Sequence, residues 1–282
     1  MALMEAGFFS QTLGLNCQAN VIIPQSSSGG EPRPSASAAN SGIGVKGSSK
    51  QKTYPVLWLL HGASDDHTIW LRRTSIERYV SHLGIAVVMP AAHLSGYVNM
   101  AHGQKYADFF TDELPKIMQD FFPLSAKRED NYVAGLSMGG AGALSLGLGR
   151  PDVFSAIGCF SAGNLNIRRN NPAANKRKSG KACRDLAVYG VEDRTKLLGN
   201  SEYDCFAKAE AAITAGKKLP RIFHCIGRED FLYDNAKKTE AWFKDHPQFD
   251  YTFHEAPGAH TWEFWDEWVQ KFLKWLLPKC DS

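Results

Sequence analysis

The sequence predicts an α/β fold in which a mostly parallel central sheet is flanked by helices. Short apolar runs typical of strands buried on both faces occupy residues 54–60, 85–90, 131–134, 156–160, 221–226 and 251–255. Helical patterns lie between several of these runs, most clearly over residues 106–122, 233–244 and 262–277. Buried strands that alternate with helices form right-handed crossovers, which build a parallel sheet.

The length of 282 residues fits one large α/β domain spanning residues 1–282. A β-rich segment, Leu15–Pro24, is expected to form the first, antiparallel strand. Residues 25–52 consist largely of Ser, Gly, Ala and Pro, which predicts a flexible, low-complexity hairpin insertion. Residues 161–220 separate two core strands by far more than a crossover needs, so part of this stretch is expected to form a cap over the site.

Charge and cysteine usage narrow the classes of partner and compartment. A formal net charge of +3 is too small to indicate nucleic acid or an anionic membrane as the main partner. Residues 168–181 hold six Lys or Arg and no acid, and a solvated loop is favoured there over an anion or nucleic-acid site. No secretory signal or membrane-spanning apolar run is found, and the six cysteines are scattered. We therefore expect a cytoplasmic protein with reduced thiols.

Ser137 is the candidate nucleophile. It is the central residue of the segment Gly135-Leu136-Ser137-Met138-Gly139, where an apolar run meets a helix rich in small residues. A serine on such a strand-to-helix turn takes a strained conformation, and the glycines two residues to either side let the chain bend tightly. The alternative is a glycine-rich turn with a purely structural role.

The candidate base is a histidine, because a serine hydroxyl needs a base within hydrogen-bond reach. In α/β-hydrolases the order along the chain is Ser, acid, His, which leaves the four histidines after Ser137. His224 and His254 fall in predicted strands, where buried neutral imidazoles are expected, and His246 falls at an exposed helix end. His260 alone lies in a loop between a strand and the last helix, so it is the favoured base.

The acid that orients this base is expected in the loop after the fifth apolar run. Asp230 is favoured, because Phe231 and Leu232 would anchor the loop and shield the carboxylate. Glu229 is the second choice and is expected to form an exposed ion pair with the arginine before it. Asp234 is expected in the first turn of the following helix, where a negative charge is favourable.

An oxyanion hole is expected from backbone N–H groups that face the charge developing on the acyl oxygen. One donor is expected from Met138, the residue after the serine. The other is expected in the turn after the first apolar run, from Ala63 or, as the second choice, from Gly62.

Several motifs in combination resemble the esterase D and tributyrin esterase family of α/β-hydrolases. They are His61-Gly62 and residues 70–74, 135–140, 227–232 and 258–262. The resemblance covers nearly the whole chain outside residues 25–52, a segment that departs from the compact bacterial members. It implies an α/β-hydrolase fold and carboxylesterase activity on short acyl groups, with S-formylglutathione hydrolases, feruloyl esterases and acyl transferases as relatives. It also implies a triad of Ser137, Asp230 and His260, with Ala63 and Met138 as oxyanion donors.

The sequence therefore predicts a serine carboxylesterase that acts on a small-molecule acyl ester through an acyl-enzyme, without a metal or organic cofactor. A thioesterase of the S-formylglutathione hydrolase type and a non-catalytic binding protein with the same fold are the alternatives. Trp70, Tyr97 and Trp262 lie close in sequence to the site loops and are candidates to line the substrate pocket, with core packing as an equal alternative. Homo-oligomerisation is left open.

Overall fold

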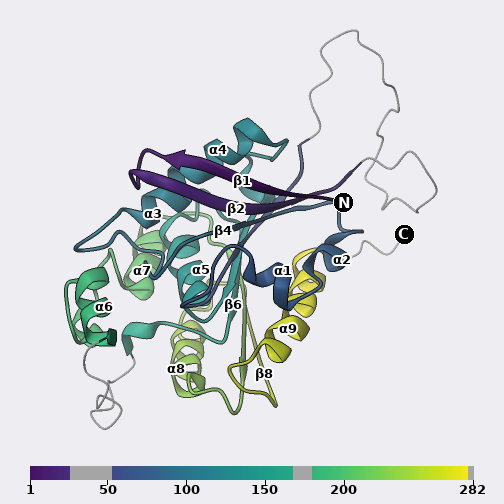
Figure 1. Ribbon diagram of the computed structural model, residues 1–282. Helices are drawn as coiled ribbons and strands as arrows, with labels where there is room; N and C mark the ends of the chain where they lie inside the picture. The colour runs from purple at the N-terminus through teal and green to yellow at the C-terminus, as the bar shows by residue number, and fades with distance from the viewer. Residues whose placement is uncertain (26–52, 168–179, 279–282) are drawn as a thin grey trace, which may run out of the picture.

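The computed structural model describes residues 1–25, 53–167 and 180–278. In this part of the chain an eight-stranded sheet forms the centre of the molecule, with strand order β1-β2-β4-β3-β5-β6-β7-β8 (Figure 1). Strands β3 to β8 are parallel to one another, whereas β1 and β2 are antiparallel and lie at one edge. The strands are Ala2–Ser10 (β1), Leu15–Ile23 (β2), Val56–Leu60 (β3), Ala86–Pro90 (β4), Asn131–Leu136 (β5), Ala156–Phe160 (β6), Arg221–Gly227 (β7) and Tyr251–Ala256 (β8). The predicted α/β class with a mostly parallel sheet is confirmed.

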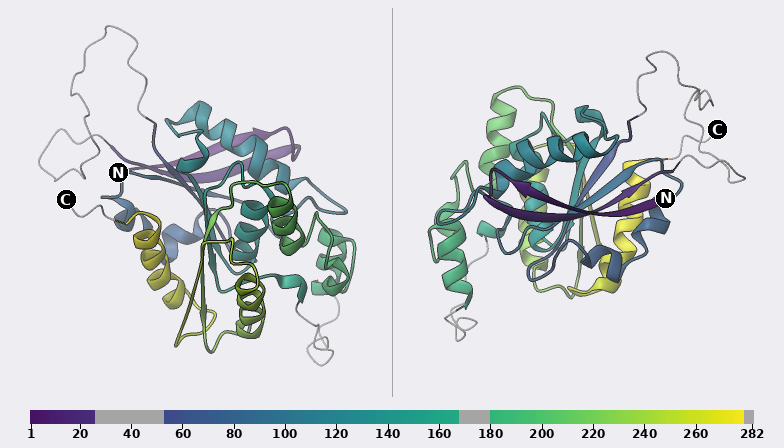
Figure 2. Two further views of the ribbon diagram at one scale, coloured as in Figure 1. Left: turned by 180° about the vertical axis from the view of Figure 1, so that it is seen from behind. Right: turned by 45° about the horizontal axis from the view of Figure 1, so that its top comes forward.

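Helices cover both faces of this sheet, as the two further views show (Figure 2). One face carries α1 (Ile69–Arg73), α2 (Ile76–Val80) and α9 (Trp262–Leu276). The other carries α3 (Tyr106–Asp108), α4 (Leu114–Phe121), α5 (Met138–Gly149), α7 (Cys205–Thr214) and α8 (Tyr233–Lys244). Helix α6 (Gly180–Tyr189) lies at the periphery, away from the sheet (Figure 1).

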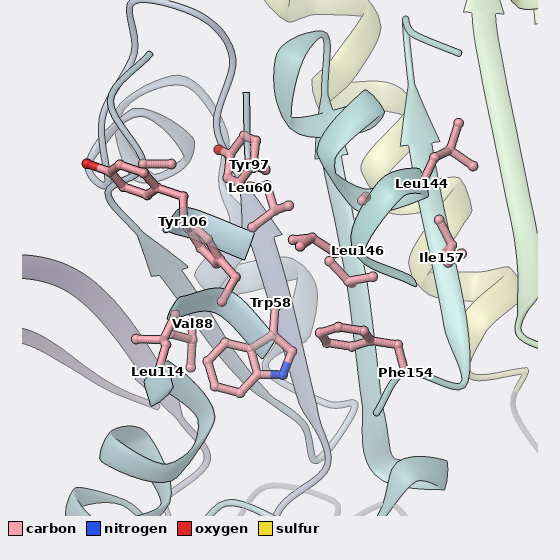
Figure 3. Packing of buried hydrophobic residues seen from close by; sticks show 14 of the residues in the cluster. Trp58, Leu60, Val88, Tyr97, Tyr106, Leu114, Leu144, Leu146, Phe154 and Ile157 are labelled. Carbon is pink, nitrogen blue, oxygen red and sulfur yellow. The ribbon is translucent and has the colours of Figure 1, made fainter. Parts of the chain in front are cut away.

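The two core layers follow from the alternation of side chains along the strands. In β3, Trp58 and its neighbours two residues away point to the α5 side, where they pack with Leu144 and Leu114 (Figure 3). Leu57 and Leu59 point to the opposite side and belong to the cluster that contains Phe272 of α9. Every residue of β3 is buried, which explains why its sequence is a continuous apolar run.

Three features of the fold differ from the prediction or lie beyond it. An unpredicted strand, β1, precedes Leu15–Ile23, so the predicted first strand is the second. The predicted insertion lies outside the described residues apart from Gln25, and the strands on either side of it do not form a hairpin, because β4 lies between β2 and β3. The predicted helix 106–122 is present but contains a π-helical turn, Phe109–Glu113, between α3 and α4.

His224 of β7 is fully buried, which confirms the prediction of a buried neutral imidazole. Its Nδ1 lies 2.7 Å from the Tyr251 hydroxyl, and its Nε2 lies 3.1 Å from the carbonyl oxygen of Ala162. A carbonyl only accepts, so Nε2 carries the proton and Nδ1 accepts from the tyrosine. Burial lowers the pKa of His224 from 6.5 to about 4.

We expect the free energy of unfolding to decrease as the pH falls from about 6.5 to about 4, because His224 takes up a proton in the unfolded chain before it does in the folded one. The contribution is fully present above pH 6.5 and is about 3 kcal/mol for this residue. Urea unfolding across this pH range measures it. The variant His224→Asn, which cannot titrate there, should show a shallower dependence, and equal slopes in both proteins would disprove the assignment.

Four described cysteines, Cys17, Cys159, Cys205 and Cys225, are buried and unpaired, as expected for reduced thiols. Burial raises the pKa of the Cys159 and Cys225 thiols far above its ordinary value. Among the described residues, no helix combines the length and the apolar character needed to cross a bilayer.

Candidate active site

Ser137 lies at the junction between β5 and α5, in a backbone conformation that L-residues rarely adopt. Its φ is +54° and its ψ is −117°, and helix α5 begins at the next residue. The flanking glycines are required by close packing. A Cβ at Gly139 would lie 2.6 Å from the carbonyl oxygens of Leu60 and His61, and one at Gly135 would lie 2.6 Å from the backbone of Gly139. The turn thus presents the hydroxyl beyond the carboxyl end of β5 while α5 packs directly against β3 and β5.

His260 lies in the loop between β8 and α9, and its ring reaches Ser137. Its Nε2 is 2.9 Å from the Ser137 Oγ, and its Nδ1 is 2.8 Å from Oδ2 of Asp230. The ring packs between Phe231 and Trp265: its centroid lies 4.4 Å from that of Phe231 and 4.9 Å from that of Trp265, whose ring is perpendicular to it. These contacts hold the imidazole in one plane, so both of its nitrogens stay aligned with their partners.

Asp230 lies in the turn after β7, and its side chain is fully buried. Its Oδ1 accepts a hydrogen bond from the backbone N–H of Leu232, which leaves Oδ2 for His260. Leu232 is buried as expected, whereas Phe231 is 61 % exposed and covers the imidazole instead of the carboxylate.

Glu229, the second choice for the acid, points elsewhere. Its exposed carboxylate accepts a hydrogen bond from the backbone N–H of Gly258 at 2.5 Å, and it does not form the ion pair expected with Arg228. It therefore ties the turn after β7 to the loop that carries His260. The other histidines after Ser137 lie apart from the hydroxyl: His224 is in the core, His246 stacks on Trp242 and His254 packs against Trp268.

In the turn after β3, the backbone N–H groups of Gly62 and Ala63 have different surroundings. The carboxylate of Asp65 lies beside Gly62; burial raises its pKa, whereas the backbone N–H of Gly62 acts in the opposite direction. Ala63 lines the same cavity as Ser137 and Met138. Among the described residues, no acceptor takes a hydrogen bond from the N–H of Ala63 or of Met138. Both groups are therefore available to an oxygen atom of a bound molecule.

His61 holds the Gly62–Ala63 peptide in place. It is 1 % exposed, and burial lowers its pKa to about 4, so the ring is neutral. Its Nε2 accepts from the N–H of Ala92 at 2.9 Å, which puts the proton on Nδ1, and Nδ1 lies 2.7 Å from the carbonyl oxygen of Gly62. In a trans peptide the C=O and the following N–H point in opposite directions. Fixing the Gly62 carbonyl therefore fixes the direction of the Ala63 N–H.

Two cavities meet at Ser137. The larger has a volume of about 580 Å³ and is lined by Ala63, Met138 and Phe231 near the serine, with Arg184 and Arg194 among its other lining residues. The smaller, of about 430 Å³, is lined by His260, Trp262, Asp65 and Arg73. Ser137 thus lines both cavities.

The three aromatic residues predicted to line the pocket have different positions. Trp262 lines the smaller cavity. Trp70 is buried behind it, with its Nε1 donating to the carbonyl oxygen of Leu60 and its ring against Trp262. Tyr97 is also buried, and its hydroxyl donates to the carbonyl oxygen of His61. Trp70 and Tyr97 do not line either cavity; they are buried core residues that support the turn after β3 by donating to the backbone carbonyls of Leu60 and His61.

Residues 161–220 contribute one wall of the larger cavity. The contributing segments include the turn η3 (Leu165–Ile167), helix α6 and the turn η5 (Arg194–Leu197). The basic stretch 168–181 lies mostly outside the described residues. Sequence reasoning missed Arg184 and Arg194 as cavity residues and the side-chain role of His61. The arginines carry no local signal, whereas His61 follows directly on a buried strand, where site loops begin.

Comparison with known proteins identifies the family. The family model Esterase, described as "Putative esterase", matches residues 44–276. An acetyl esterase from Caldicellulosiruptor saccharolyticus is 25 % identical over 282 residues, which is 100 % of both chains.

Two similar solved structures come from Staphylococcus aureus. The fluorophosphonate-binding serine hydrolase FphF, solved with bound substrate, is 28 % identical with a TM-score of 0.77. The S-formylglutathione hydrolase FrmB shows the same identity and TM-score, and each match covers 98 % of both chains. These findings confirm the prediction of an esterase of the serine hydrolase class with an α/β-hydrolase fold. The chain belongs to the Esterase family.

Proposed function

We propose that this protein is a serine carboxylesterase that hydrolyses short-chain acyl esters through a triad of Ser137, His260 and Asp230. The observation that supports this best is the continuous hydrogen-bonded arrangement from Asp230 through His260 to the hydroxyl, with separations of 2.8 and 2.9 Å. We propose the cytoplasm as its location and residues 161–220 as a cap over the site.

The reaction proceeds in two halves. His260 takes the proton of Ser137 as Oγ attacks the ester carbonyl, and the buried carboxylate of Asp230 stabilises the imidazolium that forms. The N–H groups of Ala63 and Met138 hold the negative oxygen of the tetrahedral intermediate. His260 then gives its proton to the departing alcohol, which leaves an acyl-enzyme. Water attacks this ester with the same base, and the carboxylic acid is released.

A thioesterase acting on S-formylglutathione is the second candidate, because the FrmB structure resembles this chain over nearly its full length. The same groups would perform that reaction. Turnover of para-nitrophenyl esters from acetyl to octanoyl, compared with turnover of S-formylglutathione, separates the two. Highest kcat/KM on the acetyl to butyryl esters supports the carboxylesterase, and a strong preference for the thioester supports the alternative. A protein that turns over neither class would be the non-catalytic binding protein.

His61 provides a test of the oxyanion donor at Ala63. We expect His61→Ala to lower kcat by about 100- to 1,000-fold with a small change in KM, because the misdirected N–H stabilises the charge that appears only in the transition state. His61→Asn can place an amide N–H near the position of Nδ1 and should recover part of this loss. His61→Gln places its amide further out and should recover less. Equal kcat for the wild type and the alanine variant, at unchanged thermal stability, would exclude this role.

A further inference from the structure

The larger cavity beside Ser137 has more room than a short acyl group needs. Its volume of about 580 Å³ falls in the range of pockets that enclose whole drug-sized ligands, roughly 300 to 1,000 Å³. An acetyl or butyryl chain would occupy a small part of it. A second, larger portion of the substrate therefore has space there.

The chemical character of the cavity changes between its lining segments. Leu94, Met138 and Leu232 provide apolar surface in the part built by the central elements. Helix α6 and the turn η5, which belong to residues 161–220, add Arg184 and Arg194. A ligand that fills the cavity would therefore meet both apolar side chains and guanidinium groups.

The two arginines differ in how their charge is balanced. Arg184 lies 3.5 Å from the buried carboxylate of Asp185. Arg194 has no ion-pair partner among the described residues. Its Nε donates to Oδ1 of Asn166 at 3.2 Å, and its Cζ lies 4.1 Å from the centroid of the Tyr189 ring, on which the guanidinium stacks. Asp204 does not form an ion pair with Arg194; its carboxylate accepts hydrogen bonds from one side-chain amide and two backbone N–H groups.

These contacts fix the plane of the Arg194 guanidinium, and within the described part of the chain its two terminal nitrogens donate to no other group. A planar fork of N–H donors matches the two oxygens of a carboxylate. We propose that the preferred substrates of this site are esters that carry a carboxylate on their acyl or alcohol part, and that Arg194 binds this carboxylate in the larger cavity. The inference rests on the proposed esterase function and names the class of substrate.

The test compares matched pairs of esters. On the acyl side, mono-para-nitrophenyl glutarate is compared with para-nitrophenyl pentanoate; on the alcohol side, para-carboxyphenyl acetate is compared with phenyl acetate. In one of the two pairs, Arg194→Gln should lower kcat/KM for the carboxylate ester by about 10- to 100-fold, mainly through KM, and change the neutral partner by less than about twofold. The pair that responds shows which part of the substrate enters the cavity. Arg194→Lys keeps the charge without the fork and should lose less.

Arg78→Gln is the matched control, because Arg78 also stacks on a tyrosine, Tyr79, but lies on α2 away from the cavity. It should leave all four rate constants unchanged. If Arg194→Gln changes kcat/KM equally for the charged and the neutral ester of both pairs, or changes kcat/KM for none of the four esters, the inference is wrong. Should the Arg194 variants fail to fold, inhibition of the wild type by glutarate and by para-hydroxybenzoate decides: competitive inhibition by either supports the inference, and inhibition by neither overturns it.

The variant Ser137→Ala distinguishes a failure of this inference from a failure of the proposed esterase function. Turnover that survives this change would overturn the esterase mechanism, whatever Arg194 does. Turnover that is lost with Ser137→Ala, combined with an unchanged ratio of charged to neutral esters in Arg194→Gln, would overturn only the inference about the carboxylate.

Discussion

Replacing Ser137 with alanine is expected to lower kcat for a para-nitrophenyl acyl ester by about 10⁴- to 10⁶-fold. The change removes the oxygen that lies 2.9 Å from His260 and leaves the rest of the site intact. Stability should be nearly preserved, because alanine keeps the Cβ and the backbone conformation with positive φ is imposed by the neighbours of Ser137. Steady-state kinetics and thermal unfolding of the same preparation measure both effects.

Ser155→Ala is a suitable control for this experiment. Ser155 precedes β6 at the opposite end of the sheet, and its hydroxyl donates to the backbone oxygens of Glu129 and Asn131. Its activity should equal that of the wild type. Retention of more than about a tenth of the wild-type kcat in Ser137→Ala would show that another group attacks the ester. The double variant with His260→Ala should be no slower than Ser137→Ala alone, because the two residues act as a unit.

Replacing Asp230 with asparagine is expected to lower kcat by about 10³- to 10⁴-fold. An amide has nearly the shape of the carboxylate but lacks its charge, and it can present N–H groups to the Nδ1 of His260. The imidazole would then hold its proton on Nε2, facing Ser137, where it cannot act as a base. KM should change little, because Asp230 is buried and does not line either cavity.

Glu229→Gln is the control for Asp230→Asn, because Glu229 is the other acid that could orient His260. The glutamine oxygen can still accept from the N–H of Gly258, so we expect activity within a few fold of the wild type. The reverse result, a large loss in Glu229→Gln and a small one in Asp230→Asn, would assign the orienting acid to Glu229.

Much of the fold is predictable from the sequence because the parallel strands are buried on both faces. The run from Ala156 to Phe160 has the same bounds in the sequence pattern and in the structure, and so does helix Tyr233–Lys244. Strand β1 was missed because it lies at the edge of the sheet. It exposes Leu3 and Phe9, and its sequence ALMEAGFFS does not alternate between apolar and polar residues, so the regular alternation of its burial cannot be read from the sequence. Its position depends on pairing with β2, a contact that local sequence does not report.

The candidate site was predictable where it depends on loop position and unpredictable where it depends on packing. Ser137, Asp230 and His260 follow the carboxyl ends of parallel strands, and such ends lie at one edge of a sheet. The positions of Trp70 and Tyr97 depend on which backbone carbonyls their polar atoms reach, and no sequence pattern encodes that. Arg194 lines the same cavity as Ser137 although the two residues lie far apart in the sequence, and such a tertiary contact leaves no local sequence signal.

The central claim is that the hydroxyl of Ser137 is activated by the imidazole beside it. Reaction with a fluorophosphonate probe, followed by peptide mapping by mass spectrometry, tests this most directly. We predict one adduct, on Ser137, that forms rapidly in the wild type, much more slowly in Asp230→Asn and not at all in Ser137→Ala. An adduct on another residue, or equal labelling of Ser137 when His260 is replaced by alanine, would contradict the claim.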